Sequence, residues 1–273
     1  MTGSSTEVEE RCRRIRTRVL ERLHAATASH LGTNMSMVEI LAAIYTVTDV
    51  ARISVGASDR DRVVISKGHS AAATYAALEE FGILSTKLMD TYHQSGSLLA
   101  GHVSHGVPGV EHSTGALGHG LSVALGMAIA QRSLRQDGRV FCVCGDGEMQ
   151  EGSVWEALLL WRHLGLSNLV LLVDHNRISS ITRTHDVIAM DPPATRFEGL
   201  GFIAQTVDGH DVEEIIAAIL AALVGDRPTV IVCETVKGKG VSFAEHEPIW
   251  HYRSLTDELL VTALKDVAGG MVL

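Results

Sequence analysis

The sequence has little of what marks secreted, fibrous or membrane-bound proteins. Its 273 residues include only five prolines and four cysteines, and aromatic residues make up 4%. The cysteines show no CxxC spacing, and Cys142, Cys144 and Cys233 lie in apolar segments, which predicts buried thiols rather than a disulfide framework. No apolar run is long enough to span a bilayer, and residues 1–10 are polar and acidic, unlike a signal peptide. We therefore expect a cytoplasmic protein that makes no use of a membrane.

Positive charge is also scarce. The net charge is −9, charged residues make up 20% of the chain and hydrophobic residues 46%. The one basic cluster, residues 11–18, alternates with apolar residues at helical spacing, which predicts a solvated helix face. We therefore do not expect nucleic acid as a partner. With no linker-like or low-complexity tract, residues 1–273 are expected to form a single domain.

The apolar segments predict a doubly wound α/β fold. Strands are expected at residues 62–66, 139–144, 168–174, 201–208 and 228–236. Helices are expected up to about residue 28 and at 37–47, 70–81, 117–134, 151–163 and 211–224. Thr6 with Glu9, and Ser36 with Glu39, have the spacing of capping boxes at the first two helices. Unbroken apolar strands separated by helices are typical of a mostly parallel sheet with helices on both faces.

Polar segments follow three of these strands: Gly145-Asp146-Gly147-Glu148, Asn176 with its neighbours, and the KGKG run at 237–240. The carboxyl ends of parallel strands meet at one edge, where such sheets bind ligands. One carboxylate and one amide oxygen suit Mg²⁺ or Ca²⁺ whose other positions are filled by phosphate oxygens and water. The helix after Glu151 can direct its N-terminus at the same anion. Lys237 and Lys239 fit a ligand role and a solvated loop equally well.

In their order along the chain, several segments resemble motifs of the transketolase family. These are SHLG (29–32), SKGH (66–69), GH (101–102), EHSTGALGHG (111–120), GDGEMQEGSVWEA (145–157), DHNRIS (174–179), KGKGVSF (237–243) and WH (250–251). The resemblance covers nearly the whole chain and implies the thiamine diphosphate-binding fold. It also implies an enzyme that uses thiamine diphosphate and Mg²⁺ (or Ca²⁺) to transfer a two-carbon ketol unit from a ketose donor to an aldose acceptor.

The resemblance also implies roles for individual residues. The metal ligands are expected to be Asp146, Asn176 and the backbone carbonyl of Ile178. Contacts to the cofactor are expected from His69, Gly115, Ala116, Leu117, Gly145, Asp146, Gly147, Glu148, Asn176 and His251. Four histidines, which titrate near neutrality, are expected to bind sugar hydroxyls and move protons, namely His30, His69, His102 and His251. Glu151 matches an acid that couples two active sites across a subunit interface. Glu148 is expected to be a turn neighbour whose removal is milder than that of Asp146.

The resemblance extends only to the first domain of transketolases, so this chain is similar to the N-terminal subunit of a split transketolase. We expect it to assemble, as two copies of each, with a C-terminal subunit that carries the pyrimidine-binding domain, and to act on sugars or sugar phosphates. The chain departs from the family pattern at Leu31, Ala116, Tyr252 and residues 179–186. These departures leave cofactor binding intact and favour a specialised sugar, such as a branched, deoxy or sulfonated one.

Three alternatives remain open from the sequence. The α subunit of a 2-oxoacid dehydrogenase shares the GDG and Asn signals, although that reaction has no sugar hydroxyls for the SKGH and HLG histidines to bind. A zinc hydrolase using His102 and His105 with His112 or His119 belongs to a different class. A scaffold that binds the cofactor without catalysis is the third.

Overall fold

The computed structural model describes residues 5–190 and 193–269, and its strands are joined by helical segments. The strands are β1 Arg62–Ile65, β2 Val140–Gly145, β3 Leu169–His175, β4 Ile203–Asp208 and β5 Thr229–Glu234. The α-helices are α1 Ser5–Ala25, α2 Leu31–Ser36, α3 Val38–Val47, α4 Val50–Ser54, α5 Ala71–Glu80, α6 Thr86–Met89, α7 Gly120–Ser133, α8 Gly152–Leu164, α9 Thr184–Val187, α10 Pro193–Gly199, α11 Val212–Val224 and α12 Asp257–Gly269. Short 3₁₀ turns lie at Gly68–Ser70, Glu148–Gln150 and Pro248–His251.

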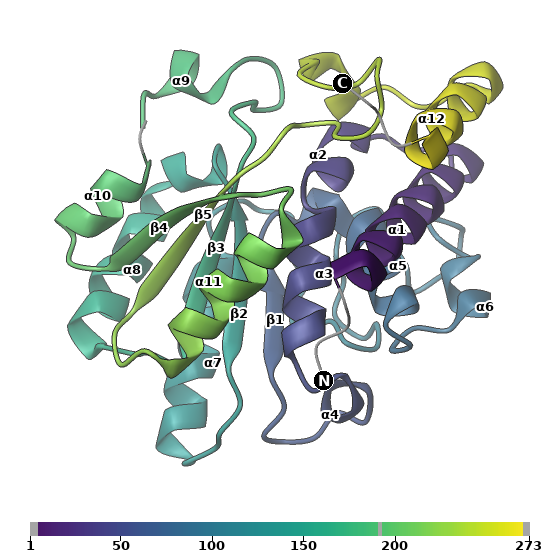
Figure 1. Ribbon diagram of the computed structural model, residues 1–273. Coiled ribbons are helices and arrows are strands. Elements are labelled where there is room, and N and C mark those ends of the chain that lie inside the picture. Colours follow the sequence, from purple (N-terminus) through teal and green to yellow (C-terminus); the bar gives the residue numbers. More distant parts are fainter. Residues whose placement is uncertain (1–4, 191–192, 270–273) are drawn as a thin grey trace.

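The strands form a sheet of order β1-β2-β3-β5-β4 in which every neighbouring pair is parallel. Helices cover both of its faces (Figure 1). Along β2, Phe141 and Val143 pack into the core shared with α1, α3, α5 and α11, while Cys142 and Cys144 pack with α7, α8 and α10. In β2, β3 and β5 both faces are buried, which explains the lack of polar alternation in these strands, whereas the edge strand β4 is only partly buried. The predicted doubly wound α/β fold is confirmed. In the part of the chain described, no helix combines the length and apolarity needed to cross a membrane.

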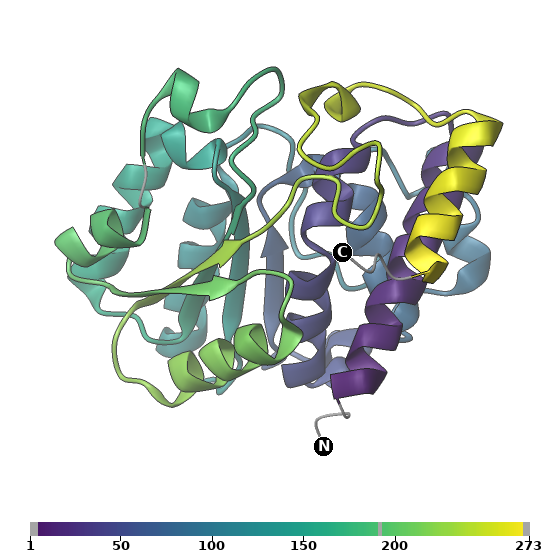
Figure 2. The same ribbon diagram turned by 45° about the horizontal axis from the view of Figure 1, so that its top comes forward.

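The polar segments that follow the strands gather at the carboxyl edge of the sheet. This is the upper edge in Figure 1, and Figure 2 turns it toward the viewer. The register pairs Gly145 with Asp174, so β2 and β3 end level with each other. The N–H of Asp146 donates to the carbonyl of Asp174 at 3.2 Å. Asp146 and Asn176 therefore leave the sheet side by side, as the strand order requires.

The two predicted capping boxes are wrong. Helix α1 begins at Ser5, so Thr6 lies inside it. Ser36 is the last residue of α2, and its hydroxyl donates 2.6 Å to the carboxylate of Asp174 instead of capping α3. Glu39 faces α1 and pairs with Arg16. Spacing alone identified polar residues near helix ends, but tertiary partners decided where those side chains point.

The charge pattern predicted that the arginines of α1 form a solvated face, but this holds for Arg13 and not for Arg16 or Arg18. Arg18 binds Glu79 at 2.7 Å and Asp90 at 2.6 Å, and both partners lie outside α1. Arg16 is buried and donates to both oxygens of Glu39 at 2.5 and 2.8 Å. These ion pairs fasten α1 to α3 and α5, so the cluster contributes to the fold rather than to a binding surface.

The buried pair gives a stability prediction. Burial alone raises the pKa of Glu39, but Arg16 and His210 outweigh it and hold that pKa at about 2, below its ordinary value of 4.5. The contribution of the pair is therefore present above about pH 4.5 and is lost as the pH falls toward 2. Arg16→Ala leaves the carboxylate without its cation and should lower the free energy of unfolding by about 3–5 kcal/mol at pH 7.

Urea unfolding of the wild type and of Arg16→Ala measures this difference, which should shrink as the pH is lowered from 5 to 2. Arg13→Ala is the matched control, because Arg13 is exposed and, among the described residues, forms its ion pair with Glu10, whose side chain is 45% exposed. Its cost should stay below about 1 kcal/mol. Equal costs for the two variants would show that the buried pair is not a major stabilising contact.

Candidate active site

A cavity of about 460 Å³ opens at the carboxyl edge of the sheet. It is lined by most of the residues predicted from the sequence, namely His30, His69, His102, Gly115, Leu117, Gly145, Asp146, Gly147, Glu148, Asn176, Ile178 and His251. Two predicted residues, Ala116 and Glu151, do not line it. Both are exposed, in the loop before α7 and at the N-cap of α8. The structure thus brings predicted residues from seven separate segments of the chain together around one space.

A second cavity of about 540 Å³ lies between α1, the start of α11 and the end of α12. It is larger, but none of the predicted site residues lines it. Acidic and basic side chains are mixed around it, including the Arg16–Glu39 pair and Lys239. We therefore place the candidate active site in the 460 Å³ cavity.

Asp146 and Asn176 offer hard oxygen donors in a fixed arrangement. The carboxylate of Asp146 accepts the N–H of Gly147 at 2.7 Å and also the N–H of Arg177. The amide nitrogen of Asn176 donates a hydrogen bond to Asp174 at 3.1 Å, so the amide oxygen of Asn176 is the atom left for a ligand. This oxygen also accepts the N–H of Ile178 at 3.1 Å. Together with the carbonyl of Ile178, this is a donor set typical of Mg²⁺ or Ca²⁺.

The charge at this position also favours a cation. Burial and the neighbouring Asp174 raise the pKa of Asp146 to about 6, so the ionised carboxylate is poorly stabilised by the protein alone. Among the described residues, no group of three or more His, Cys, Asp or Glu side chains is arranged to hold a metal. A cation here would need other ligands, such as phosphate oxygens, and the zinc cluster required by a hydrolase receives no support.

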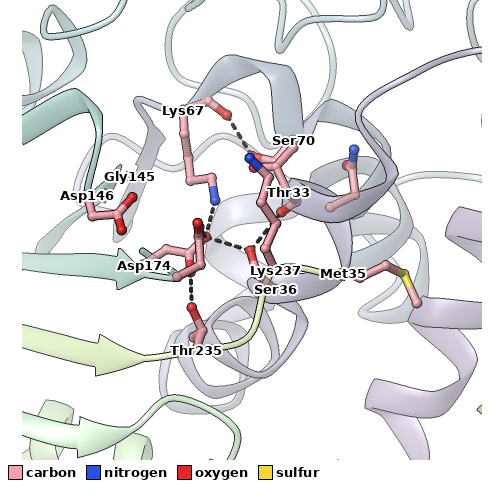
Figure 3. Close-up of polar contacts among 12 residues, drawn as sticks. Thr33, Met35, Ser36, Lys67, Ser70, Gly145, Asp146, Asp174, Thr235 and Lys237 are labelled. Atoms are coloured by element: carbon pink, nitrogen blue, oxygen red, sulfur yellow. Dashed lines mark hydrogen bonds and ion pairs between the residues drawn. The ribbon is translucent and has the colours of Figure 1, made fainter. Parts of the chain in front are cut away.

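A buried ion pair between Lys67 and Asp174 contacts one of the candidate metal donors, Asn176. Asp174 is completely buried, and its carboxylate accepts hydrogen bonds from Lys67, Ser36 and Thr235 (Figure 3). It also accepts one from the amide of Asn176. Burial alone would raise the pKa of Asp174, but Lys67 outweighs it and the pKa is lowered. No role could be assigned to Lys67 from the SKGH motif, because nothing in a motif shows that its ammonium is buried.

Lys237 lies inside the cavity. Its Nζ atom donates to the carbonyls of Ile178 at 3.1 Å and Ser179 at 2.7 Å, and lies 3.3 Å from Nδ1 of His251. Burial and the charge of Lys67 lower the pKa of Lys237 to about 8. Lys239, two residues later, lines the other cavity instead. Lys237 and Lys239 fit the same roles by sequence, but they line different cavities.

The four predicted histidines form one cluster. The ring centroid of His30 lies 5.5 Å from that of His69, 5.6 Å from that of His102 and 4.9 Å from that of His251. Burial, with added repulsion from neighbouring cationic groups, lowers the pKa of His30 to about 4 and that of His251 to about 3, and it also lowers the pKa of His69. These three imidazoles are neutral at pH 7, so each can donate one hydrogen bond and accept one.

Comparison with known proteins identifies the family. Residues 8–269 match the model of the transketolase thiamine diphosphate-binding domain. The chain belongs to the transketolase family. It is 36% identical over 257 residues, 93% of this chain and 91% of the relative, to a subunit of the apulose-4-phosphate transketolase of Phocaeicola vulgatus. It is 32% identical over 270 residues, 98% of both chains, to 6-deoxy-6-sulfo-D-fructose transketolase subunit SqwG of Clostridium sp..

Solved transketolases share the fold. The enzyme from Leishmania mexicana superimposes with a TM-score of 0.88 at 29% identity, and the enzyme from Campylobacter jejuni with 0.84 at 27%. The alignments cover 96% and 97% of this chain but only 41% and 42% of those enzymes. The chain thus spans less than half the length of these transketolases. The family match favours a transketolase over a 2-oxoacid dehydrogenase subunit.

Glu148 is not the peripheral turn residue that the sequence predicted. It is 2% exposed, and one carboxylate oxygen accepts the Ser66 hydroxyl and the N–H of Gly118 at 2.8 Å. The other oxygen accepts the N–H of Gly145 at 3.2 Å. Gly118 has a φ of 81°, which is why α7 begins at Gly120 and not at residue 117. One carboxylate therefore joins three of the loops that line the transketolase site.

Glu148→Ala should be strongly destabilising for this reason. It leaves three buried donors without an acceptor, and each unsatisfied group costs about 1–3 kcal/mol. Thermal unfolding of the purified chain measures the loss, with Glu156→Ala on the exposed face of α8 as the control. A Glu148→Ala melting temperature within a degree or so of the control would contradict the clamp role.

Proposed function

We propose that this chain is the diphosphate-binding subunit of a two-subunit transketolase and that residues 1–273 act as one domain. The observation that carries the proposal is the convergence of Asp146, Asn176 and the Ile178 carbonyl with four histidines in one cavity. An oxygen donor set beside a neutral imidazole cluster suits a metal-bound diphosphate and a polyhydroxylated substrate. The family match and the names of the relatives, which call them subunits, support the same conclusion.

In this proposal Asp146, Asn176 and the Ile178 carbonyl hold Mg²⁺, with Ca²⁺ as a substitute, against the diphosphate of thiamine diphosphate. Gly145 and Gly147 leave the backbone open to close approach, and Lys67 and Lys237 are the buried cations nearest these donors. Two lysines face three carboxylates, Asp146, Glu148 and Asp174, so the protein alone offers no excess of positive charge to an anion. A divalent metal supplies the missing charge.

Bound thiamine diphosphate supplies an electron sink for cleavage and formation of a carbon–carbon bond. The residues of this chain bind and orient the sugar around it. Neutral His30, His69 and His251 can form hydrogen bonds with hydroxyl groups of the sugar, which fixes the donor and holds protons near its hydroxyl groups. His102 is exposed, with its ring centroid 5.6 Å from that of His30, and in this proposal it is the first of the four histidines that an entering sugar meets.

A partner subunit is part of this proposal, because the family match is to the thiamine diphosphate-binding domain and the relatives are named as subunits. Glu151 and Leu117 are exposed beside the cavity, at the N-cap of α8 and in the loop before α7. They are positioned to meet a second polypeptide that closes the site. Two copies of each subunit is the assembly we propose, with Glu151 near the axis that relates the two sites.

The substrate is proposed to be a sugar or sugar phosphate outside the common pentose phosphates. Tyr252, Ile181 and Val187 line the mouth of the cavity with more than half of each side chain exposed. Tyr252 and Ile181 lie where the chain departs from the family pattern. By their names, the two relatives are transketolases for apulose 4-phosphate and for 6-deoxy-6-sulfo-D-fructose, which supports testing substrates of this kind.

The proposal is tested by assaying ketol transfer with the chain alone, with a pyrimidine-domain subunit encoded beside it, and with that partner by itself. Thiamine diphosphate, Mg²⁺ and a panel of linear, branched and sulfonated ketose substrates complete the assay. Turnover is expected only when both subunits are present. Turnover by the chain alone would refute the two-subunit proposal, and cofactor binding without turnover on any substrate would favour a scaffold.

Asp146→Asn should separate stability from cofactor binding. The pKa of Asp146 is raised in the folded chain, so its ionisation destabilises the fold as the pH rises through about 6. Without cofactor, the variant should therefore melt at a higher temperature than wild type at pH 7.5, and the difference should shrink as the pH falls from 6 and vanish below the ordinary value of 3.8. The stabilisation that the two-subunit complex gains from thiamine diphosphate and Mg²⁺ should disappear. An unchanged cofactor-induced shift would remove Asp146 from the metal site.

A further inference from the structure

The ammonium of Lys237 is enclosed by three acceptors. It contacts the carbonyls of Ile178 and Ser179 at 3.1 and 2.7 Å and Nδ1 of His251 at 3.3 Å. An ammonium has three N–H donors and no acceptor. The two carbonyls take two of the donors, and the imidazole nitrogen is left for the third. The contact set therefore matches the number of protons on a charged lysine.

The path of the Lys237 stem is fixed by its surroundings. A Cβ atom at Gly32 would lie 2.9 Å from Cγ of Lys237 and 3.3 Å from its Cε, so a glycine is needed where the stem crosses α2. The N–H of Gly238 donates to the carbonyl of Gly32 at 2.9 Å and holds the two segments together. Lys237 is 2% exposed, so its ammonium has little freedom to leave these acceptors.

His251 is held from its backbone as well. Its carbonyl accepts the N–H of His30 at 3.1 Å, and its ring packs at 4.9 Å from that of His30 and 5.2 Å from that of His69. With the ring fixed in place, the remaining freedom is which nitrogen carries the proton. That choice is set by the hydrogen bond that the other nitrogen makes.

We propose that Lys237 is a positioning residue that fixes His251 as the Nε2–H tautomer. Because the ammonium can only donate, Nδ1 must present its lone pair to it, and the single proton of the neutral ring lies on Nε2. Burial and the charge of Lys237 lower the pKa of His251 to about 3, which agrees with a neutral ring. His251 then offers its ligand a hydrogen-bond donor and not an acceptor.

The use of this donor rests on the proposed function. In the transketolase site, an Nε2–H would hold a diphosphate or sugar oxygen in place and would not remove a proton from it. The tautomer itself does not depend on the cofactor or the partner. The tautomer assignment can therefore be wrong while the proposed function is right, and it can be right while the proposed function is wrong.

The test is a long-range ¹H–¹⁵N correlation spectrum of the histidine side chains in the full ¹⁵N-labelled chain without cofactor. A pH of 6.5 lies below the pKa of Lys237, about 8, so the ammonium form predominates. Comparison with His251→Gln assigns the His251 signals. The wild type should show one neutral tautomer with the proton on Nε2. Lys237→Met, which keeps the stem and removes the donor, should change it to a mixture of tautomers or to the Nδ1–H form.

Lys239→Met is the matched control, since Lys239 lines the other cavity, and it should leave the His251 pattern as in wild type. Backbone amide spectra verify that each variant is folded. A wild-type His251 that is protonated on Nδ1, or on both nitrogens, overturns the proposal without any variant. An Nε2–H pattern that survives in folded Lys237→Met overturns it as well, because the tautomer would then have another cause.

Discussion

The buried carboxylate of Asp174 is the point on which the site depends. It lies at the end of β3 with no exposed surface, and burying such a charge is costly unless it is paired and fully hydrogen-bonded. Lys67 supplies the pairing, and Ser36, Thr235 and Asn176 complete the hydrogen bonds. These donors come from α2, from the segment after β1 and from those after β3 and β5. One charge thus ties together the segments that surround the cavity.

This pairing also explains why the metal donors are preorganised. Asp174 fixes the amide of Asn176, while the backbone of Gly147 and Arg177 fixes the carboxylate of Asp146. The charge of Asp174 makes ionisation of Asp146 unfavourable in the chain by itself. A site that holds its ligands in place but leaves one carboxylate poorly neutralised is less stable empty than filled, which is a common compromise at functional sites. In the proposed enzyme, the metal and the diphosphate remove that imbalance together.

Much of the architecture could be predicted from the sequence. The unbroken apolar strands and the segments between them are local signals, and they located β1 to β5, the parallel sheet and the edge where Asp146 and Asn176 meet. The four histidines were grouped by resemblance, and the structure places them in one cluster. The orientation of charged side chains was not predictable in the same way. Arg16, Glu39 and Glu148 were assigned to solvent, a helix cap and a turn, yet each is buried against a residue far away in the sequence.

The two lysines of the KGKG run are a second case in which the orientation of a charged side chain could not be predicted from the sequence. Lys237 and Lys239 share a glycine-rich loop and have similar neighbours in sequence, but only one reaches the cavity. The difference comes from the close crossing at Gly32 and the carbonyls of Ile178 and Ser179, contacts made across more than 50 residues of chain. Motif spacing carries no information about such contacts.

The most direct test of the account is to locate the metal. Crystals of the chain with its partner subunit, thiamine diphosphate and Mn²⁺ in place of Mg²⁺ would give an anomalous difference peak at the ion. We expect one strong peak bonded to the Asp146 carboxylate, the Asn176 amide oxygen and the Ile178 carbonyl, and in contact with the diphosphate. A peak elsewhere, or a diphosphate bound without a metal at these three oxygens, would contradict the account.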